Sequence, residues 1–107
     1  RNNLKFDDLD LWEIHEAFAS QVLATIKKIQ DKNFTKKLGI DFDFGPFPMG
    51  ILNPNGSSIS IGHPFGATGA RILSQSTKHL TQLGTGKKAI ISVCADGGLG
   101  AVALIEN

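Results

Sequence analysis

The amino-acid sequence predicts an α/β fold in which helices pack on a mixed β-sheet. Two nearly all-apolar segments, residues 89–93 and 101–105, have the composition of strands that are buried on both faces. Two longer segments, residues 16–29 and 67–83, repeat their apolar residues with the period of a helix. The resulting order of strand, helix, loop, helix, strand, strand is that of an α/β layer. Because two helices give little cover to such a sheet, we expect the chain to be part of a larger assembly.

The first half of the chain predicts one strand and one helix. Residues 9–14 are typical of a short buried strand that contains Trp12, and residues 16–29 follow as a helix. Lys27 and Lys28 lie near the helix end, where cations complement the helix dipole. One face of this helix is expected to carry its apolar positions, which are Phe18, Val22, Ile26 and Ile29, with Ala19 and Leu23 beside them.

The middle segment, residues 31–56, is predicted to be irregular. It is too apolar for a free linker, since it contains Phe42, Phe44, Pro46, Phe47, Pro48 and Met49. We therefore expect a loop that packs onto a surface. Two interpretations remain open, a loop anchored on its own domain and a loop that contacts substrate or another subunit.

The second half predicts a short strand, a helix and a returning pair of strands. Residues 57–61 alternate as a strand does, and residues 84–86 supply the glycines that end the second helix. Residues 95–99 contain two glycines and suit a tight return between the last two strands. The second helix is expected to bury the face formed by Leu73, Thr77, Leu80 and Leu83.

Length and composition limit the possible functions. The 107 residues fit one domain, and a net charge of +1 without a basic patch argues against a nucleic-acid or anionic-membrane surface. No apolar run approaches the ~20 residues of a membrane span. A single cysteine excludes an internal disulfide, and the histidines lack the short spacing of a metal site. The chain begins with Arg1, as a fragment or processed product would, so cytoplasmic, mitochondrial and peroxisomal locations all stay open.

His63 is the first candidate functional residue. It lies in a turn that runs from Gly62 to Gly69, is stiffened by Pro64 and opens into the second helix. A neutral imidazole held there can donate a hydrogen bond to a developing oxyanion. A lone histidine in a loop is often structural or solvated, but the surrounding glycines favour a functional residue. The turn lacks the Gly-Lys-Ser/Thr end of a phosphate-binding loop.

Cys94 and His15 are the other two candidates, because each lies at the end of a predicted strand. The glycines after Cys94 would allow a ligand carbonyl to approach the backbone around Asp96 and Gly97. A thiol can act as a base or as a nucleophile once its pKa is lowered, although a cysteine at a strand end is more often an inert core residue. His15 could equally be a capping or buried structural histidine. Glu16 could orient the region of His15 or bind a water, and an exposed carboxylate at a helix start explains it equally well.

These strand-end segments, in this order, resemble the C-terminal portion of a thiolase, and the resemblance covers nearly all of residues 9–106. Residues 1–107 would then be a partial, C-terminal thiolase-like domain without the N-terminal half. A histidine at position 15, where biosynthetic thiolases usually have asparagine, resembles the degradative 3-ketoacyl-CoA thiolases of fatty-acid oxidation complexes. The matching segments are His15-Glu16-Ala17-Phe18-Ala19, Asn53-Pro54-Asn55-Gly56, Gly62-His63-Pro64 through Gly69-Ala70-Arg71, and Cys94 with its glycines.

The resemblance implies a role for each candidate. His63 would help to activate a nucleophilic cysteine and would donate to the thioester oxyanion, and His15 would serve the same oxyanion hole directly or through a water. Cys94 would be the general acid and base, and the backbone N–H of Asp96 would help to form a second oxyanion hole. CoA and acyl-CoA would be substrates, with no metal or redox cofactor, and the full enzyme would be a homo-oligomer.

Two departures from the family pattern matter. Asp96 stands where the family usually has glycine, which would strain the backbone if that position required a positive φ. The nucleophilic cysteine of thiolases lies in the N-terminal half, whereas Cys94 occupies the acid/base position. We therefore expect the isolated chain to form no acyl-enzyme. A non-catalytic module that binds acyl-CoA or a partner chain is the alternative, and a ketosynthase-type condensing enzyme fits less well.

Overall fold

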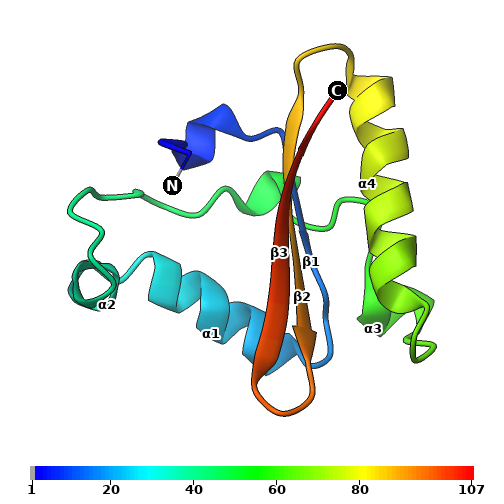
Figure 1. The fold of residues 1–107 in the computed structure, drawn as a ribbon, viewed down its shortest axis with the longest axis horizontal. Coiled ribbons are helices and arrows are strands. Elements are labelled where there is room, and N and C mark those ends of the chain that lie inside the picture. Colours follow the sequence, from blue (N-terminus) through cyan, green and yellow to red (C-terminus); the bar gives the residue numbers. More distant parts are fainter. Residues whose placement is uncertain (1) are drawn as a thin grey trace.

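The computed structural model describes residues 2–107; Arg1, the first residue of the predicted domain, lies outside the described residues. As predicted, the fold is α/β with a mixed sheet. Its strands are β1 (Leu11–Ile14), β2 (Lys88–Ala95) and β3 (Leu99–Glu106). They are ordered β1-β2-β3, with β1 parallel to β2 and β2 antiparallel to β3 (Figure 1). The tight return predicted between the last two strands is therefore present.

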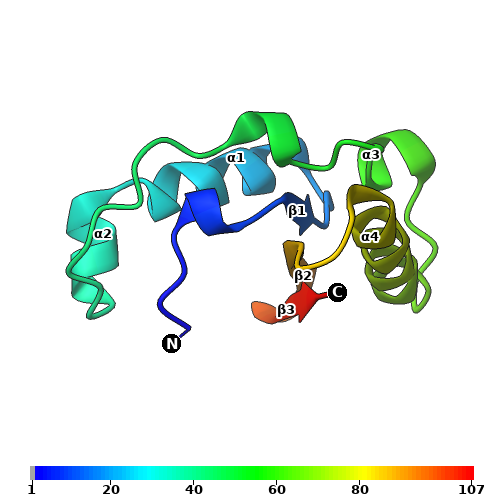
Figure 2. The same ribbon diagram turned by 90° about the horizontal axis from the view of Figure 1, so that it is seen from above.

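The longer helices lie on opposite sides of this sheet. Helix α1 (Ala19–Ile29) covers one side and α4 (Thr68–Leu83) the other (Figures 1 and 2). Two short helices, α2 (Lys32–Lys37) and α3 (Ser58–Ile61), follow α1 and precede α4, and 3-10 turns form at Phe6–Asp8 and Met49–Ile51. In the described part of the chain, no helix is long and apolar enough to cross a membrane.

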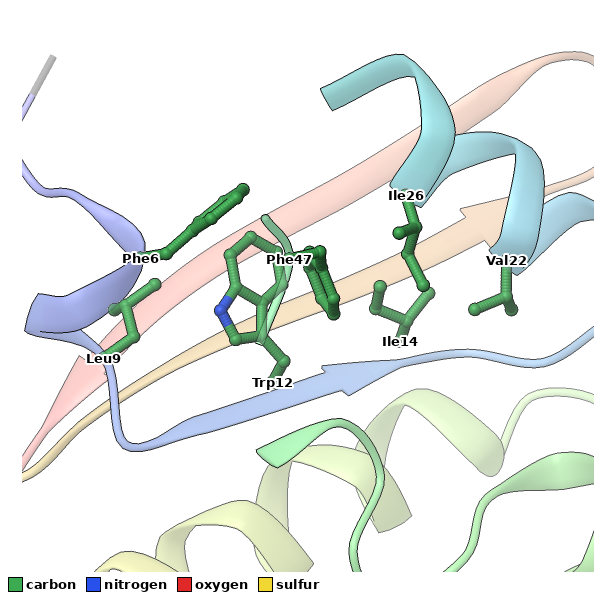
Figure 3. Packing of buried hydrophobic residues seen from close by; sticks show 7 residues of the cluster. All are labelled: Phe6, Leu9, Trp12, Ile14, Val22, Ile26 and Phe47. Atoms are coloured by element: carbon green, nitrogen blue, oxygen red, sulfur yellow. The ribbon is translucent and has the colours of Figure 1, made fainter. Parts of the chain in front are cut away.

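The main hydrophobic core lies between β1 and α1. Its buried members are Phe6, Leu9, Trp12, Ile14, Val22, Ile26 and Phe47 (Figure 3). The ring of Phe47 packs edge-on against Trp12 with 5.1 Å between centroids, and Phe44 packs against the same cluster. The aromatic part of segment 31–56 is therefore anchored on its own domain, although Phe42 and Met49 remain exposed.

The first helix begins later than predicted. Phe18, expected on its buried face, precedes α1 in an extended conformation and is 72% exposed, whereas Val22 and Ile26 are buried as expected. Segment 31–56 also contains a helix that was not predicted. The Asp31 carboxylate caps α2 by accepting hydrogen bonds from the backbone N–H groups of Asn33 and Phe34.

The buried face of α4 is rotated relative to the predicted one, mostly toward positions one residue earlier in the sequence. Thr68, Ile72, Ser76 and Leu80 are buried, whereas Leu73 and Leu83 are nearly half exposed. Of the predicted residues only Leu80 is buried. Ser76 is small, and its hydroxyl donates to the Ile72 carbonyl 2.8 Å away, so the buried face accommodates a polar side chain at no hydrogen-bonding cost.

Residues 57–61 were predicted as a strand, which is wrong. The carbonyl of Ser57 accepts hydrogen bonds from the N–H groups of Ser60 and Ile61 and so closes the helical turn of α3. An alternation of serine and isoleucine over five residues is too short to distinguish the two structures. Both isoleucines of this segment are exposed, so no apolar strand face is buried here.

The prediction that both late strands are buried on two faces holds only partly. Ala89 and Ile91 of β2 are buried, but Leu99 and Val102 of β3 are 70% and 71% exposed. The reason is that β3 is an edge strand, most of which lies beyond the area of the sheet that α1 and α4 cover (Figure 2).

Candidate active site

A cleft of about 610 Å3 lies at the end of the sheet where β1 and β2 finish. Because these two strands are parallel, their carboxyl ends meet at this end, which is where open α/β sheets commonly bind ligands. The starts of α1 and α4 and the β2–β3 loop lie at this end of the sheet (Figure 1). They contribute further lining residues to the cleft, among them Gln21, Thr68 and Asp96. Its lining residues are His15, Ala17, Phe18, Gln21, His63, Phe65, Gly66, Thr68, Gly69, Val93, Cys94, Ala95 and Asp96.

His15 directly follows β1 and is fixed by its backbone and its ring. Its N–H donates to the Ser92 carbonyl at 2.8 Å, which continues the pairing of β1 with β2. Its Nδ1 lies 2.8 Å from the Ser58 hydroxyl, and only 2% of the residue is exposed. Burial is the main cause that lowers the pKa of His15, and smaller electrostatic contributions from the neighbouring His63 and Arg71 act in the same direction. His15 is therefore a neutral imidazole at pH 7.

His63 lies opposite His15 on the more exposed wall of the cleft. The two ring centroids are 4.4 Å apart, and the rings are tilted by 49°. The Nδ1 of His63 lies 2.7 Å from the hydroxyl of Thr68, the first residue of α4. Gly62 has a φ of 107°, which is accessible to few other residues, so this glycine allows the turn that places the ring.

Cys94 is the penultimate residue of β2 and lines the same cleft as the two histidines. Its thiol is partly buried and lies 3.9 Å from the side-chain oxygen of Gln21 in α1, to which it donates. The three residues that sequence reasoning selected are thus brought together, although nearly 80 residues separate His15 from Cys94.

Asp96 and Gly97 occupy the β2–β3 loop and differ in their access to the cleft. Asp96 lines the cleft, but Gly97 does not. The Asp96 carboxylate accepts a hydrogen bond from the Gly97 N–H at 2.8 Å, so that N–H is already engaged. The positive φ values of this loop fall on Gly97 and Gly98, at 81° and 73°, and not on Asp96. Aspartate at this position is therefore unstrained.

Glu16 and Asn53 join the segments that carry the two histidines. Asn53 extends the pairing of β1, because its side chain accepts from the Ile14 N–H at 2.8 Å and donates to the Ile14 carbonyl at 3.0 Å. The Glu16 carboxylate accepts from the Asn53 side chain at 2.8 Å and from the Ile59 N–H at 3.1 Å. The structure favours the interpretation in which Glu16 orients this region, since its carboxylate fixes α3 beside His15.

Glu13 is a buried carboxyl on the β1 face that also carries Leu11 and His15, and it does not line the cleft. It has no exposed surface, and among residues 2–107 neither of its oxygens has a hydrogen-bond partner. Burial raises its pKa to about 7, with the nearby Glu16 charge adding to the effect and Arg71 opposing it.

Sequence reasoning missed three polar residues that contact the candidate side chains. Ser58 and Thr68 hold the Nδ1 atoms of the two histidines, and Gln21 contacts the Cys94 thiol. Thr68 could have been found, because a hydroxyl at a helix start shortly after a turn histidine lies within its reach. Ser58 had no such signal, since its segment was predicted as a strand. His79 lies away from the cleft, where its Nδ1 is 3.1 Å from the side-chain amide of Asn55.

Comparison with known proteins identifies a family. The model for the thiolase C-terminal domain matches residues 1–107. A 3-ketoacyl-CoA thiolase of Alteromonas mediterranea is 44% identical over the whole chain, and a probable 3-ketoacyl-CoA thiolase of Caenorhabditis elegans is 46% identical over 96% of it. The chain spans 24% and 23% of those relatives, about a quarter of their length.

Solved structures show the same fold. The human mitochondrial 3-ketoacyl-CoA thiolase in complex with CoA matches 97% of the chain with a TM-score of 0.71 and 32% identity, over 22% of its own length. The peroxisomal 3-ketoacyl-CoA thiolase of Saccharomyces cerevisiae, described as a five-layered A-B-A-B-A structure, matches 97% of the chain with a TM-score of 0.68 and 35% identity, over 25% of its own length.

Proposed function

Because this chain belongs to the thiolase family, whose C-terminal domain it matches over its whole length, we propose that it carries one half of the active site of a 3-ketoacyl-CoA thiolase. The reaction is acyl transfer from a 3-ketoacyl-CoA to CoA, which gives acetyl-CoA and an acyl-CoA shortened by two carbons. The observation that carries the proposal is the convergence of His15, His63 and Cys94 on one cleft at the ends of β1 and β2. CoA and acyl-CoA are substrates, and the chemistry requires no resident metal or redox cofactor.

The first half-reaction needs a nucleophilic thiol that this chain does not supply. Its single cysteine, Cys94, is assigned to proton transfer, so the nucleophile comes from the N-terminal thiolase half. In this proposal His63 accepts the thiol proton, and the thiolate attacks the 3-keto carbon. The bond between C2 and C3 then breaks, and the acetyl-CoA enolate that leaves takes a proton from Cys94. The acyl group remains on the enzyme as a thioester.

The second half-reaction returns the proton. The Cys94 thiolate removes the proton of an incoming CoA thiol, whose sulfur attacks the acyl thioester and releases the nucleophilic cysteine as a thiolate. That thiolate takes its proton back from His63. In both steps negative charge develops on a carbonyl oxygen, and N–H groups of His15 and His63 are suited to stabilise it. Loss of one such donor typically costs about 2.7–4 kcal/mol of barrier. The backbone N–H of Asp96, which lines the cleft, is suited to stabilise the enolate oxygen.

The test compares the 107-residue chain with a longer protein that carries the N-terminal half. After incubation with acetyl-CoA, intact-mass spectrometry should find an acetyl group on the longer protein and none on the chain. A stable thioester on Cys94 of the chain would contradict the assignment of that residue to proton transfer. Homo-oligomer formation belongs to the same proposal, and light scattering of the longer protein tests it.

A non-catalytic module is the second candidate, in which the chain binds an acyl-CoA or a partner chain without turning it over. The exposure of Leu99 and Val102 on β3 favours it, because a sheet edge of this kind is suited to a partner. The two functions differ in one measurement. A module would bind acyl-CoA without releasing CoA, even when the longer protein is used.

A further inference from the structure

The two histidines of the cleft make the same kind of contact, but the hydroxyl groups that they contact differ. In each ring Nδ1 lies within 2.8 Å of a buried hydroxyl, from Ser58 for His15 and from Thr68 for His63. A hydroxyl has one hydrogen to donate, whereas a neutral imidazole has one N–H and one lone pair. The other contacts of each hydroxyl therefore decide which ring nitrogen carries the proton.

The Thr68 hydroxyl has a second partner. Its oxygen lies 3.3 Å from the Pro64 carbonyl, which can only accept, so a hydrogen bond between them requires the hydroxyl hydrogen. If His63 carries its proton on Nδ1, it donates to the Thr68 oxygen and both hydrogen bonds form together. If the proton is on Nε2, the Thr68 hydrogen has to serve two acceptors, and one bond is lost. The contacts thus favour Nδ1–H in His63.

The Ser58 hydroxyl has no second partner among residues 2–107. If His15 donated from Nδ1, the buried Ser58 hydrogen would have no acceptor, which is an unfavourable arrangement. If the Ser58 hydroxyl donates to Nδ1, both groups are satisfied and the ring proton is on Nε2. In the described residues, the buried side-chain nitrogen and oxygen atoms without a hydrogen-bond partner are Trp12 Nε1 and the two Glu13 oxygens. The Nε2 atom of His15 is not one of them, so it is accessible to solvent. It therefore reaches the cleft that His15 lines.

We propose that Ser58 and Thr68 hold the two cleft histidines in opposite neutral tautomers, so that His15 presents an N–H to the cleft and His63 presents a lone pair. Ser58 and Thr68 are positioning residues in this arrangement, because they act through the imidazoles and not on the substrate. Two adjacent rings of the same residue type thereby become a hydrogen-bond donor and a proton acceptor.

This assignment deepens the proposed function, on which its chemical meaning rests. The His63 lone pair is ready to accept the proton of the nucleophilic thiol, and His63 can donate to the oxyanion only after that transfer. His15 can donate from the start. The oxyanion of the first attack is thus met by two donors, one present in the resting site and one created by the proton transfer itself.

The experiment reads the tautomers directly by NMR on the full chain with 15N-labelled histidine rings. Two-bond 1H–15N correlations at a pH above the imidazole titration show which ring nitrogen carries the proton. His79→Gln identifies the third histidine, which lies away from the cleft. We expect Nε2–H in His15 and Nδ1–H in His63, the latter by roughly tenfold, which is the factor that one typical hydrogen bond provides. The same tautomer in both rings would overturn the proposal.

Variants of the two hydroxyl residues test the cause. Thr68→Val keeps the shape of the side chain and should shift His63 toward Nε2–H, whereas Thr68→Ser should restore Nδ1–H. Ser58→Ala should move the His15 Nδ1 resonance toward that of an acceptor without a hydrogen bond. Retention of Nδ1–H in a folded Thr68→Val chain would refute the role of Thr68. If that variant does not fold, the unmodified chain and Thr68→Ser still decide the matter.

No substrate is needed for these spectra, so they are independent of the proposed function. A longer protein without acyl-transfer activity would leave the tautomers as they are and would refute only the proposed function. An active longer protein whose two histidines share one tautomer would refute only this inference.

Discussion

Substitution of Glu13 by glutamine should change the pH dependence of stability. The carboxyl is fully buried, has no hydrogen-bond partner among residues 2–107 and has a pKa raised from 4.5 to about 7. Between those two values the native chain keeps a proton that the unfolded chain has released. The native state therefore binds more protons, and the free energy of unfolding falls as the pH rises through this range.

The size of the effect follows from the two pKa values. Each unit corresponds to about 1.4 kcal/mol, so a rise from 4.5 to about 7 lowers stability by up to about 3 kcal/mol between pH 4 and pH 8. Movement of the Arg71 guanidinium toward the carboxylate on ionisation would reduce that loss. Glu13→Gln keeps the shape of the protonated side chain and cannot ionise. The variant should match the original chain near pH 5 and exceed its stability by about 2–3 kcal/mol at pH 8.

Urea unfolding of the full chain at pH 5, 6, 7 and 8 measures this difference. Trp12 is the only tryptophan and lies in the core on the other face of β1, so its fluorescence reports global unfolding. Glu106→Gln is the matched control, because that carboxylate is exposed and pairs with Lys88 only at 3.4 Å on the surface. It should leave the pH dependence nearly unchanged. Parallel curves for Glu13→Gln and the original chain from pH 5 to pH 8 would show that Glu13 ionises in the native state as it does in water.

Three further predictions concern the cleft and its support. In the longer protein, His63→Ala should lower kcat by about 10²–10³-fold through loss of an oxyanion donor, whereas His79→Ala should leave kcat unchanged. Steady-state assays measure both variants, and equal losses of kcat would remove His63 from the mechanism. Cys94→Ser should slow CoA-dependent release of the acyl group far more than acyl-enzyme formation, because a serine hydroxyl is a poor base. Rapid-quench kinetics measure the two steps separately, and equal slowing of both would count against the proton-transfer role of Cys94. Asn53→Ala removes side-chain hydrogen bonds to both backbone groups of Ile14 and to Glu16. Urea unfolding should therefore show that the free energy of unfolding falls by about 2–4 kcal/mol. A decrease below about 0.5 kcal/mol would mean that water replaces these hydrogen bonds.

The residues at strand ends could be predicted because their signals are local. Cys94 ends an apolar run and precedes glycines, and His63 lies between glycines before a helical period. Parallel strands place such ends at one edge of the sheet, so the convergence of the candidates on one cleft required only the pairing of β1 with β2. Family resemblance added the chemical roles, which neither spacing nor composition contains.

The predictions that failed depended on what lies beside a segment. The residue pair Ile59 and Ile61 gave an apolar alternation, but both side chains are exposed and the segment closes a helical turn instead of pairing with a strand. On α4 two neighbouring stripes were possible, and packing against Leu11 and Ala89 selected the one that contains Leu80. For β3 the nearly all-apolar run of residues 101–105 predicted burial on both faces, which is wrong for most of the strand. Val102 is 71% exposed, whereas Leu104 and Ile105 are partly buried against the two hydrophobic clusters.

The cleft owes its geometry to a segment that is neither helix nor strand. Leu52 forms a single parallel bridge with Trp12, and Asn53 adopts a left-handed φ of 45° so that its side chain can replace the next pair of strand hydrogen bonds to Ile14. This arrangement ends the pairing one residue before His15 and turns the chain toward α3, which delivers Ser58 to the His15 ring. A regular strand at this position would have continued alongside His15. It would then have occupied the place from which Ser58 now presents its hydroxyl to Nδ1 of His15. Asparagine is among the few residues that tolerate this φ, so the orientation of the buried histidine depends on a residue 38 positions later that does not line the cleft.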